Sequence, residues 1–389
     1  MYEPAGQRIP HLALLWPAFA AASASDLAAV FARHFANLAI GPDGAPAKEP
    51  QWATPHTVAL KLAAVQLRDF TTGAGRSPAL ICAPFALHCA ALSDLVAGHS
   101  LVATLRDAGL ARLYVTDWRS ATAEMRYRGI DDYLADLNVL VDHIGPPVDL
   151  IGLCQGGWIA VVYAARFPNK VRKLVLAAAP IDIAAGTSNL SAVAAANPLA
   201  TFREIVRLGG GLVPGGKVLK FWCPELVTAE EIRDLLQATA RTDSPAFARL
   251  EAAFRDWYAF TLDLPGTFFL EVVERLYKNN ELAAGGFVAL GQRVDLAQVR
   301  TPIYFLAARE DELVAPAQLF AAEHLVGTPP RELRKTTVPG RHLGLFMGRR
   351  VLHDVWPGIV RWLAQPTLQS SAVARTAEQV EAQNGAGYR

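Results

Sequence analysis

The chain has 389 residues, of which 52% are hydrophobic and 19% charged, and this composition supports a buried core and excludes general disorder. The formal net charge of +1 gives no global attraction to nucleic acid or to acidic partners. The four cysteines, Cys82, Cys89, Cys154 and Cys223, lack CxxC and zinc-ligand spacings, so neither a disulfide framework nor a structural metal is expected. We therefore expect reduced thiols in a cytoplasmic protein.

The chain opens with an apolar stretch, residues 11–22 (HLALLWPAFAAA), that is similar to the core of a signal peptide. Pro17 interrupts this stretch, and Glu3 stands where a signal peptide is basic. We therefore expect an amphipathic helix, within a helical or extended segment 1–74 that packs on the core. No apolar run reaches the roughly 20 residues that a membrane span needs.

From residue 79 onward, short apolar runs alternate with stretches of helical periodicity, a pattern typical of βαβ units and a mostly parallel sheet. Each run is apolar on both faces, as a sheet with helices on both sides requires. The predicted strands are Ala79–Cys82, Leu113–Thr116, Asp149–Gly152, Leu174–Ala178, Ile303–Ala307 and Lys335–Val338. The predicted helices are Ser100–Ala108, Ile130–Ile144, Trp158–Phe167, Ala315–Leu325 and Val351–Leu363.

Residues 184–297 interrupt this alternation between two predicted strands. The segment begins with a polar, turn-rich stretch and then reads mainly helical. We expect it to be an inserted cap over the functional site, which divides the core into residues 75–183 and 298–366. The tail, residues 367–389, is polar and rich in small residues, and we expect it to be disordered.

The most specific local motif is GLCQGG, residues 152–157, which follows a predicted strand and precedes a predicted helix. This context is typical of a nucleophile elbow, a sharp strand-to-helix turn that presents one side chain, here Cys154. Gly152 and Gly156 provide the small residues that the close backbone contacts of such a turn need. The helix N-terminus also favours a thiolate. The alternative interpretation is a buried structural cysteine on a glycine-rich turn.

Two later loops, each following a predicted strand, carry the partners that a cysteine nucleophile needs. Asp311 lies in REDELVAP, where an acid can orient a histidine and stabilise its imidazolium form. His342 lies in VPGRHLG, where the fold delivers a general base. Glu310 and Glu312 are expected to be solvated neighbours, and His353 a surface residue of the next helix. The order nucleophile, acid, histidine predicts an α/β-hydrolase fold.

The oxyanion hole is expected to use two backbone N–H groups. One belongs to Gln155, directly after the nucleophile, and the other to the loop that follows the Ala79–Cys82 strand. Pro84 in that loop has no N–H group, so Phe85 or Ala86 is the candidate donor.

Three further residues lie near the predicted site. His88, in the same loop, either contacts substrate or only packs locally, and the residues leave both interpretations open. Asp117 and Trp118 follow another strand and are expected to support the site structurally.

With these motifs in place, the chain resembles polyhydroxyalkanoate synthases, especially the short catalytic subunits, over most of residues 75–365. The matching pieces include GLCQGGW (152–158), VDLAQVRTPIYFLAAREDELVAP (294–316) and HLGLFMGRRVLHDVWPGIVRWL (342–363). The resemblance implies that Cys154 carries the acyl group, that His342 is the base, and that Asp311 completes a catalytic triad.

The chain departs from that family at several positions. Arg341 stands before the histidine, where the family usually has glycine, and residues 183–254 match weakly. TSNL (187–190) and LDLPGTFFLE (262–271) are equally similar to intracellular polyhydroxyalkanoate depolymerases, which share the cysteine. Those depolymerases typically have proline where this chain has Gly156. A third alternative is a catalytically weak protein that binds polymer granules, which an unreactive Cys154 would favour.

The synthase resemblance implies polymerisation of 3-hydroxyacyl-coenzyme A into polyester. It implies no cofactor and no metal, because coenzyme A enters as a thioester substrate. The implied partners are the acyl donor and the polyester chain or granule surface, with cytoplasmic, granule-associated localisation. The resemblance leaves two forms of assembly to consider, a homodimer and a complex with a partner subunit. Neither nucleic acid nor a transmembrane segment is expected.

Overall fold

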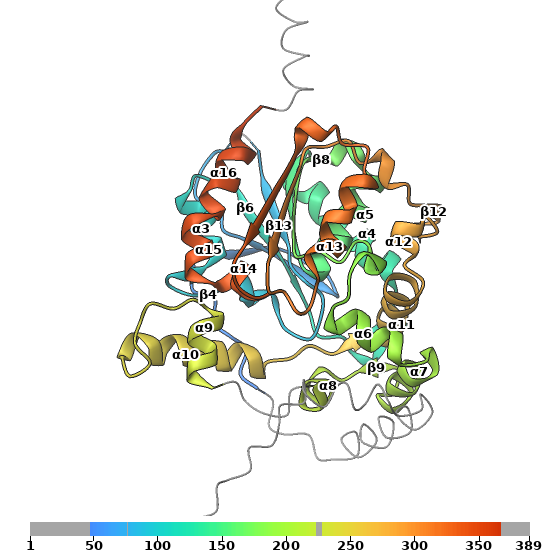
Figure 1. Ribbon diagram of the computed structural model, residues 1–389, viewed down its shortest axis with the longest axis horizontal. Coiled ribbons are helices and arrows are strands. Elements are labelled where there is room, and N and C mark those ends of the chain that lie inside the picture. Colours follow the sequence, from blue (N-terminus) through green and yellow to red (C-terminus); the bar gives the residue numbers. More distant parts are fainter. Residues whose placement is uncertain (1–46, 76, 223–227, 367–389) are drawn as a thin grey trace, which may run out of the picture.

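The computed structural model describes residues 47–75, 77–222 and 228–366, which form a central eight-stranded sheet in the order β1-β2-β6-β3-β7-β8-β13-β14 (Figure 1). β1 and β2 pair antiparallel, as do β2 and β6, and the other pairs are parallel, which confirms a mostly parallel sheet. The strands are β1 (Thr57–Lys61), β2 (Val65–Asp69), β3 (Ala79–Cys82), β6 (Leu113–Trp118), β7 (Val148–Leu153), β8 (Val171–Ala177), β13 (Ile303–Ala308) and β14 (Leu333–Val338).

The strands β1 and β2 lie ahead of residue 75, where the sequence placed the start of the core. They form one edge of the sheet rather than a separate segment packed against it. Val65 and Leu67 alternate along β2 and are fully buried, as expected for a strand that joins the sheet. The predicted helix at 11–22 and the tail 367–389 lie outside the described residues.

Helices cover both faces of the sheet (Figure 1). One face carries α3 (Leu101–Asp107), α15 (Arg349–Asp354) and α16 (Trp356–Ala364), and the other carries α4 (Ile130–Ile144), α5 (Gln155–Arg166) and α13 (Pro316–Phe320). The prediction of a single helix at Val351–Leu363 is wrong. Two helices separated at Val355 replace it, since Pro357 lacks the N–H that would continue the first. The helix predicted from Ala315 becomes a 3-10 turn, η7 (Ala321–His324), after Phe320.

An insertion leaves the sheet after β8 and returns before β13. Its helices α6, α7 and α8 lie beyond the ends of the strands, at the bottom of the view in Figure 1. It is largely helical. Its helical elements are η4 (Ile183–Ala185), α6 (Asn189–Ala196), α7 (Leu199–Leu208), α8 (Gly215–Trp222), α9 (Ala229–Leu235), α10 (Pro245–Ala259), α11 (Gly266–Glu271), the π-helix η5 (Val272–Lys278) and α12 (Glu281–Ala284). Its short strands are β9 (Leu212–Val213), β10 (Leu264–Pro265), β11 (Val288–Ala289) and β12 (Gln292–Arg293).

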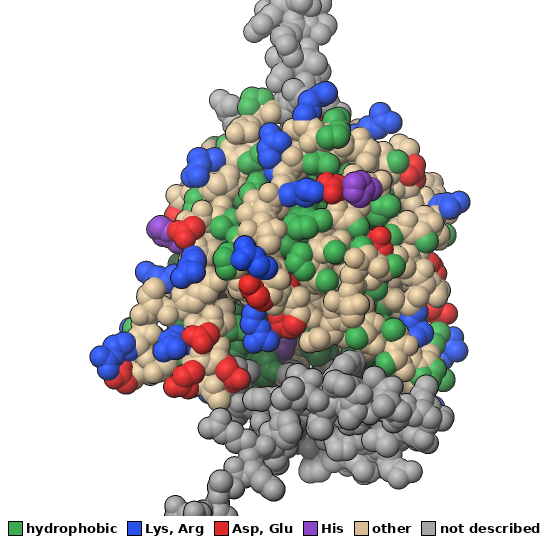
Figure 2. Space-filling model, in the orientation of Figure 1, with side chains coloured by type: hydrophobic (Ala, Val, Ile, Leu, Met, Phe, Trp, Pro, Cys, Tyr) green, Lys and Arg blue, Asp and Glu red, His purple; other side chains and the backbone are tan. Residues whose placement is uncertain are grey.

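The surface carries charges of both signs. Figure 2 shows basic and acidic side chains interspersed over the described part of one face, in keeping with the net charge of +1. Among the residues that the structure describes, no helix combines the length and the apolar character that crossing a membrane requires.

Candidate active site

Cys154 occupies a strained turn between β7 and α5. Its backbone has φ 49° and ψ −120°, a conformation that is costly for a residue with a side chain and typical of functional positions. A Cβ atom at Gly156 would lie 2.1 Å from the carbonyl oxygen of Cys82, and one at Gly152 would lie 2.5 Å from the Cα of Gly157. Both glycines are therefore required by the turn, as the motif predicted.

Asp311 and His342 lie in the loops that follow the neighbouring parallel strands β13 and β14, and they meet at the carboxyl ends of these strands. His342 Nδ1 lies 2.8 Å from Asp311 Oδ2 and 3.0 Å from Asp311 Oδ1. Asp311 Oδ1 also accepts hydrogen bonds from the backbone N–H groups of Leu313 and Val314, each at 2.9 Å. Cys154 acts on His342 as well and raises its pKa, and because Asp311 occupies Nδ1, Nε2 is the ring nitrogen left for the sulfur.

The charge state of His342 follows from its two partners. Burial alone would lower the pKa of His342, but the negative charges of Cys154 and Asp311 outweigh it and hold that pKa well above its ordinary value. His342 is only 3% exposed and Cys154 only 8% exposed, so water screens these charges weakly. The arrangement therefore stabilises the imidazolium form of His342.

The other candidate groups lack this environment. Burial raises the pKa of Cys82 to about 12 and that of Cys89 to about 12, so both stay protonated thiols. Cys223 lies outside the described residues. The side chain of His353 is 86% exposed and pairs with Asp354, its neighbour in sequence, which agrees with its predicted place at the surface.

The two glutamates beside Asp311 are not simply solvated, as the sequence analysis expected. Glu310 accepts a hydrogen bond from the backbone N–H of Gly340, and Glu312 forms an ion pair with Arg341 at 2.8 Å. Because β13 and β14 are neighbours, the loops that follow them run side by side. These contacts tie the loop that carries Asp311 to the loop that carries the histidine.

Trp118 supports the loop that follows β3. Its indole Nε1 donates to the carbonyl oxygen of Ala83 at 2.8 Å, while the Ala83 N–H donates to Thr116 Oγ1 at 3.0 Å. Asp117 instead pairs with Arg68 of β2 at 2.6 Å, a contact inside the sheet. Both residues are structural, as predicted, but only Trp118 contacts the loop.

The candidate oxyanion donors lie on both sides of Cys154. Among the described residues, the backbone N–H groups of Gln155, Phe85 and Ala86 have no hydrogen-bond partner. The ring of Phe85 is buried between Tyr133, at a centroid distance of 4.5 Å, and Phe268, at 5.0 Å, which fixes the backbone of the loop. Both loop donors stay candidates.

His88 is a packing residue that joins this loop to the insertion. Its ring lies 4.6 Å from that of Trp257 and 5.1 Å from that of Tyr258, both in α10, and its backbone forms a β-bridge with Thr261. Burial lowers the pKa of His88 to about 4, so the ring is neutral. These contacts favour the packing interpretation over contact with substrate.

Sequence analysis missed one polar residue near the nucleophile. The side-chain amide of Gln155 donates to the hydroxyl of Tyr277 in η5 at 2.6 Å. Tyr277 lies 122 residues further along the chain, in a segment without a recognisable motif. No local signal in the sequence connects these two residues.

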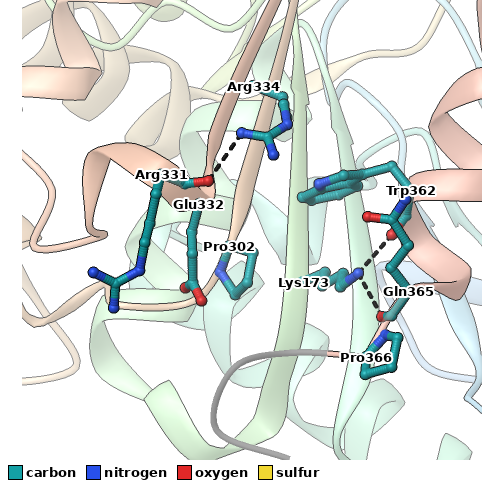
Figure 3. A pocket seen from close by; sticks show the side chains of 8 residues that line it. All are labelled: Lys173, Pro302, Arg331, Glu332, Arg334, Trp362, Gln365 and Pro366. Atoms are coloured by element: carbon teal, nitrogen blue, oxygen red, sulfur yellow. Dashed lines mark hydrogen bonds between the residues drawn. The ribbon is translucent and has the colours of Figure 1, made fainter. Parts of the chain in front are cut away.

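A cavity of about 200 Å³ opens at the opposite edge of the sheet, near the amino ends of β13 and β14 (Figure 3). Lys173 donates to the carbonyl oxygens of Trp362, at 2.5 Å, and of Gln365, at 2.7 Å, in its wall. Burial, followed by the charge of Arg172, lowers the pKa of Lys173 to about 8. Because Cys154 follows the carboxyl end of its strand, this cavity is not part of the candidate site.

Comparison with known families gives two matches along the chain. Residues 73–213 match the family described as alpha/beta hydrolase fold, and residues 228–366 match the family described as PHB de-polymerase C-terminus. A solved hydrolase from Pseudomonas aeruginosa PA01 superimposes with a TM-score of 0.50 at 15% identity, covering 80% of this chain and 98% of its own. These likenesses confirm the predicted α/β-hydrolase fold.

Curated relatives match over a larger part of the chain. A "Poly(3-hydroxyalkanoate) polymerase subunit PhaC" from Synechocystis sp. is 30% identical over 288 residues, which are 70% of this chain and 74% of the relative. Another protein with that name, from Allochromatium vinosum, is 28% identical over 263 residues, which are 64% of this chain and 71% of the relative.

Proposed function

The chain belongs to the family of poly(3-hydroxyalkanoate) polymerase subunits PhaC, and we propose that it is an acyltransferase that polymerises 3-hydroxyacyl-coenzyme A. The single observation that supports the chemistry is the buried His342–Asp311 pair, whose histidine also interacts with the charge of Cys154 at the end of a third parallel strand. The family supports the proposed substrate class, and the geometry supports the proposed roles of the residues.

The first step loads the acyl group. The Cys154 thiolate attacks the thioester carbonyl carbon and forms a new carbon–sulfur bond, while the bond to the coenzyme A sulfur breaks. The departing thiolate takes the proton that His342 holds, so His342 becomes neutral. Asp311 keeps the ring oriented through Nδ1 during this exchange.

The second step extends the polymer. Neutral His342 accepts the proton of a 3-hydroxyl group as the hydroxyl oxygen attacks the acyl-Cys154 carbonyl. An ester bond forms, the carbon–sulfur bond to Cys154 breaks, and the thiolate returns beside a protonated His342. The raised pKa of His342 suits it to hold this proton until the next acyl group is loaded. No cofactor takes part, because coenzyme A is a substrate.

A cysteine nucleophile favours the thioester reaction. Exchange of one thioester for another is nearly thermoneutral, and both thiolates leave comparably well. Attack on a polymer oxoester must instead expel a poorer alkoxide, which requires efficient protonation by His342. We therefore place polymer synthesis first.

The second candidate is an intracellular depolymerase or oligomer hydrolase that uses the same three residues. It is favoured by the match of residues 228–366 to the family described as PHB de-polymerase C-terminus. In that reaction, water or a free thiol would resolve the acyl-enzyme. Gly156 argues against it on the resemblance, since related depolymerases carry proline there and a Cβ atom would lie 2.1 Å from the Cys82 carbonyl oxygen.

Access is part of the proposal. Cys154 is 8% exposed, so an acyl donor reaches it only if surrounding segments move, and the insertion is the segment we expect to move. We propose further that the chain works at the surface of a growing polyester granule in the cytoplasm.

The acceptor experiment separates the two enzymes. The purified chain is incubated with 3-hydroxybutyryl-coenzyme A, and separately with amorphous polymer, with Cys154→Ala as the matched control. We expect release of coenzyme A with formation of polymer and little free 3-hydroxy acid. Mostly free acid, or consumption of the polymer alone, would overturn the synthase proposal in favour of the hydrolase. Consumption of neither would support a granule-binding protein.

A further inference from the structure

The side-chain amide of Gln155, directly after the nucleophile, lies between two aromatic residues. Trp158 Nε1 donates to Gln155 Oε1 at 2.7 Å, and Gln155 Nε2 donates to Tyr277 Oη at 2.6 Å. An indole N–H can only donate, so it must face the amide oxygen, which turns the amide N–H groups toward Tyr277. The Tyr277 oxygen is therefore the acceptor in this contact.

The hydroxyl proton of Tyr277 is consequently left for another acceptor. Over residues 47–75, 77–222 and 228–366, the structure gives Tyr277 no second hydrogen bond. Burial raises the pKa of Tyr277 above its usual range, and the charge of Cys154 raises it further, so the phenol keeps its proton. Because its oxygen accepts from an amide, the O–H is also a stronger donor.

The segment that carries Tyr277 is anchored on both the insertion and the core. Lys278 donates to two carbonyl oxygens at the end of α6, each at 2.7 Å. Asn280, in a left-handed conformation with φ 48°, donates to Asp182 Oδ1 at 2.7 Å and accepts from the Ile183 N–H at 2.9 Å. Asp182 and Ile183 follow the end of β8, so these contacts link the segment of Tyr277 to the carboxyl end of the sheet.

We propose that Tyr277 is a catalytic hydrogen-bond donor, which stabilises the oxyanion that forms when Cys154 attacks an acyl carbonyl. The carbonyl π electrons move onto oxygen as the sulfur–carbon bond forms, and return when the leaving group departs. The Tyr277 O–H acts beside the backbone N–H of Gln155 and keeps its proton throughout. Because the resting structure gives no hydrogen bond between Tyr277 and Cys154, the donor is not spent on the sulfur.

The test compares two reactions of the same sulfur. Acylation by 3-hydroxybutyryl-coenzyme A passes through an oxyanion, whereas alkylation by iodoacetamide does not. In Tyr277→Phe, which removes only the hydroxyl, we expect single-turnover acylation of Cys154 to slow about 10²-fold, the loss typical of one oxyanion donor, with alkylation unchanged. The matched control is Tyr163→Phe, which removes a hydroxyl that donates to Asn138 at 3.1 Å in the core, and both rates should equal those of the wild type.

Two results would overturn this role. Unchanged acylation in Tyr277→Phe would show that the hydroxyl is not used, and equal slowing of both reactions would show that Tyr277 acts on the sulfur or on the fold. The inference rests on the proposed function only for the acyl donor. If wild type ignores the coenzyme A thioester but is acylated by p-nitrophenyl butyrate, the synthase proposal fails. The same comparison with that ester then decides the role of Tyr277.

Discussion

The carboxyl edge of the central sheet and the insertion beside it contribute to one site in different ways. At the sheet edge, Cys154, Asp311 and His342 each follow a parallel strand within a few residues, so the strands place them. The insertion contributes through tertiary contacts, with Tyr277 hydrogen-bonded to the residue after the nucleophile and α10 packed on the ring of His88.

This difference separates two tasks of an acyltransferase. In the proposed mechanism the sheet edge provides the nucleophile and the proton carrier, both of which are buried. The insertion contributes neutral groups, which contact Gln155 and pack on the loop that follows β3. We therefore expect changes at the sheet edge to remove the chemistry, and changes in the insertion to reduce its rate or its pH range.

The largest effect is expected at His342. His342→Ala should lose about 10³-fold or more in the rate of coenzyme A release, because the change removes the proposed proton carrier. Asp311→Asn should lose somewhat less. It should also move the alkaline limit of the rate to lower pH, since Asp311 is one of the charges that raise the pKa of His342.

The control for this pair is His353→Ala, which alters an exposed histidine and should keep the wild-type rate. If His353→Ala proved as damaging as His342→Ala, the assignment of His342 as the base would be wrong.

A smaller effect is expected where the insertion packs on the oxyanion loop. The pKa of His88 is about 4 in the folded chain, below its ordinary 6.5. Between pH 6.5 and pH 4, His88 is therefore protonated in the unfolded chain and neutral in the folded chain. His88 therefore leaves the stability of the folded state unchanged above pH 6.5, and its cost to that stability grows as the pH drops toward 4. Between pH 7 and 5, His88 should cost the folded state about 2 kcal/mol.

His88→Phe keeps an aromatic ring between Trp257 and Tyr258 but cannot take up a proton. Urea unfolding at pH 7 and pH 5 should show a smaller loss of stability for this variant than for wild type, while His353→Ala keeps the wild-type loss. An equal loss in His88→Phe and wild type would mean that this contact does not sense pH.

The same contrast explains what the sequence could predict. β3 and α4 have the predicted bounds, because short apolar runs and helical periodicity are local features of the sequence. Cys154, Asp311 and His342 could be selected as candidates because each lies in a local motif after a predicted strand. The ion pair between Glu312 and Arg341 was missed because it joins two loops that only the pairing of β13 and β14 brings together. Tyr277 was missed for the same reason, since its partner lies 122 residues away.

The central claim is that Cys154 carries the acyl group, and mass spectrometry of the trapped acyl-enzyme tests it most directly. Wild type is mixed with 3-hydroxybutyryl-coenzyme A, quenched in acid and digested, with Cys154→Ala treated in parallel. We predict one 3-hydroxybutyryl adduct, on the peptide that contains Cys154, and none in the variant. Cys82 and Cys89 should stay unmodified, because burial holds the pKa of each thiol at about 12. An adduct on Cys82, Cys89 or Cys223, or one that persists in Cys154→Ala, would contradict the account.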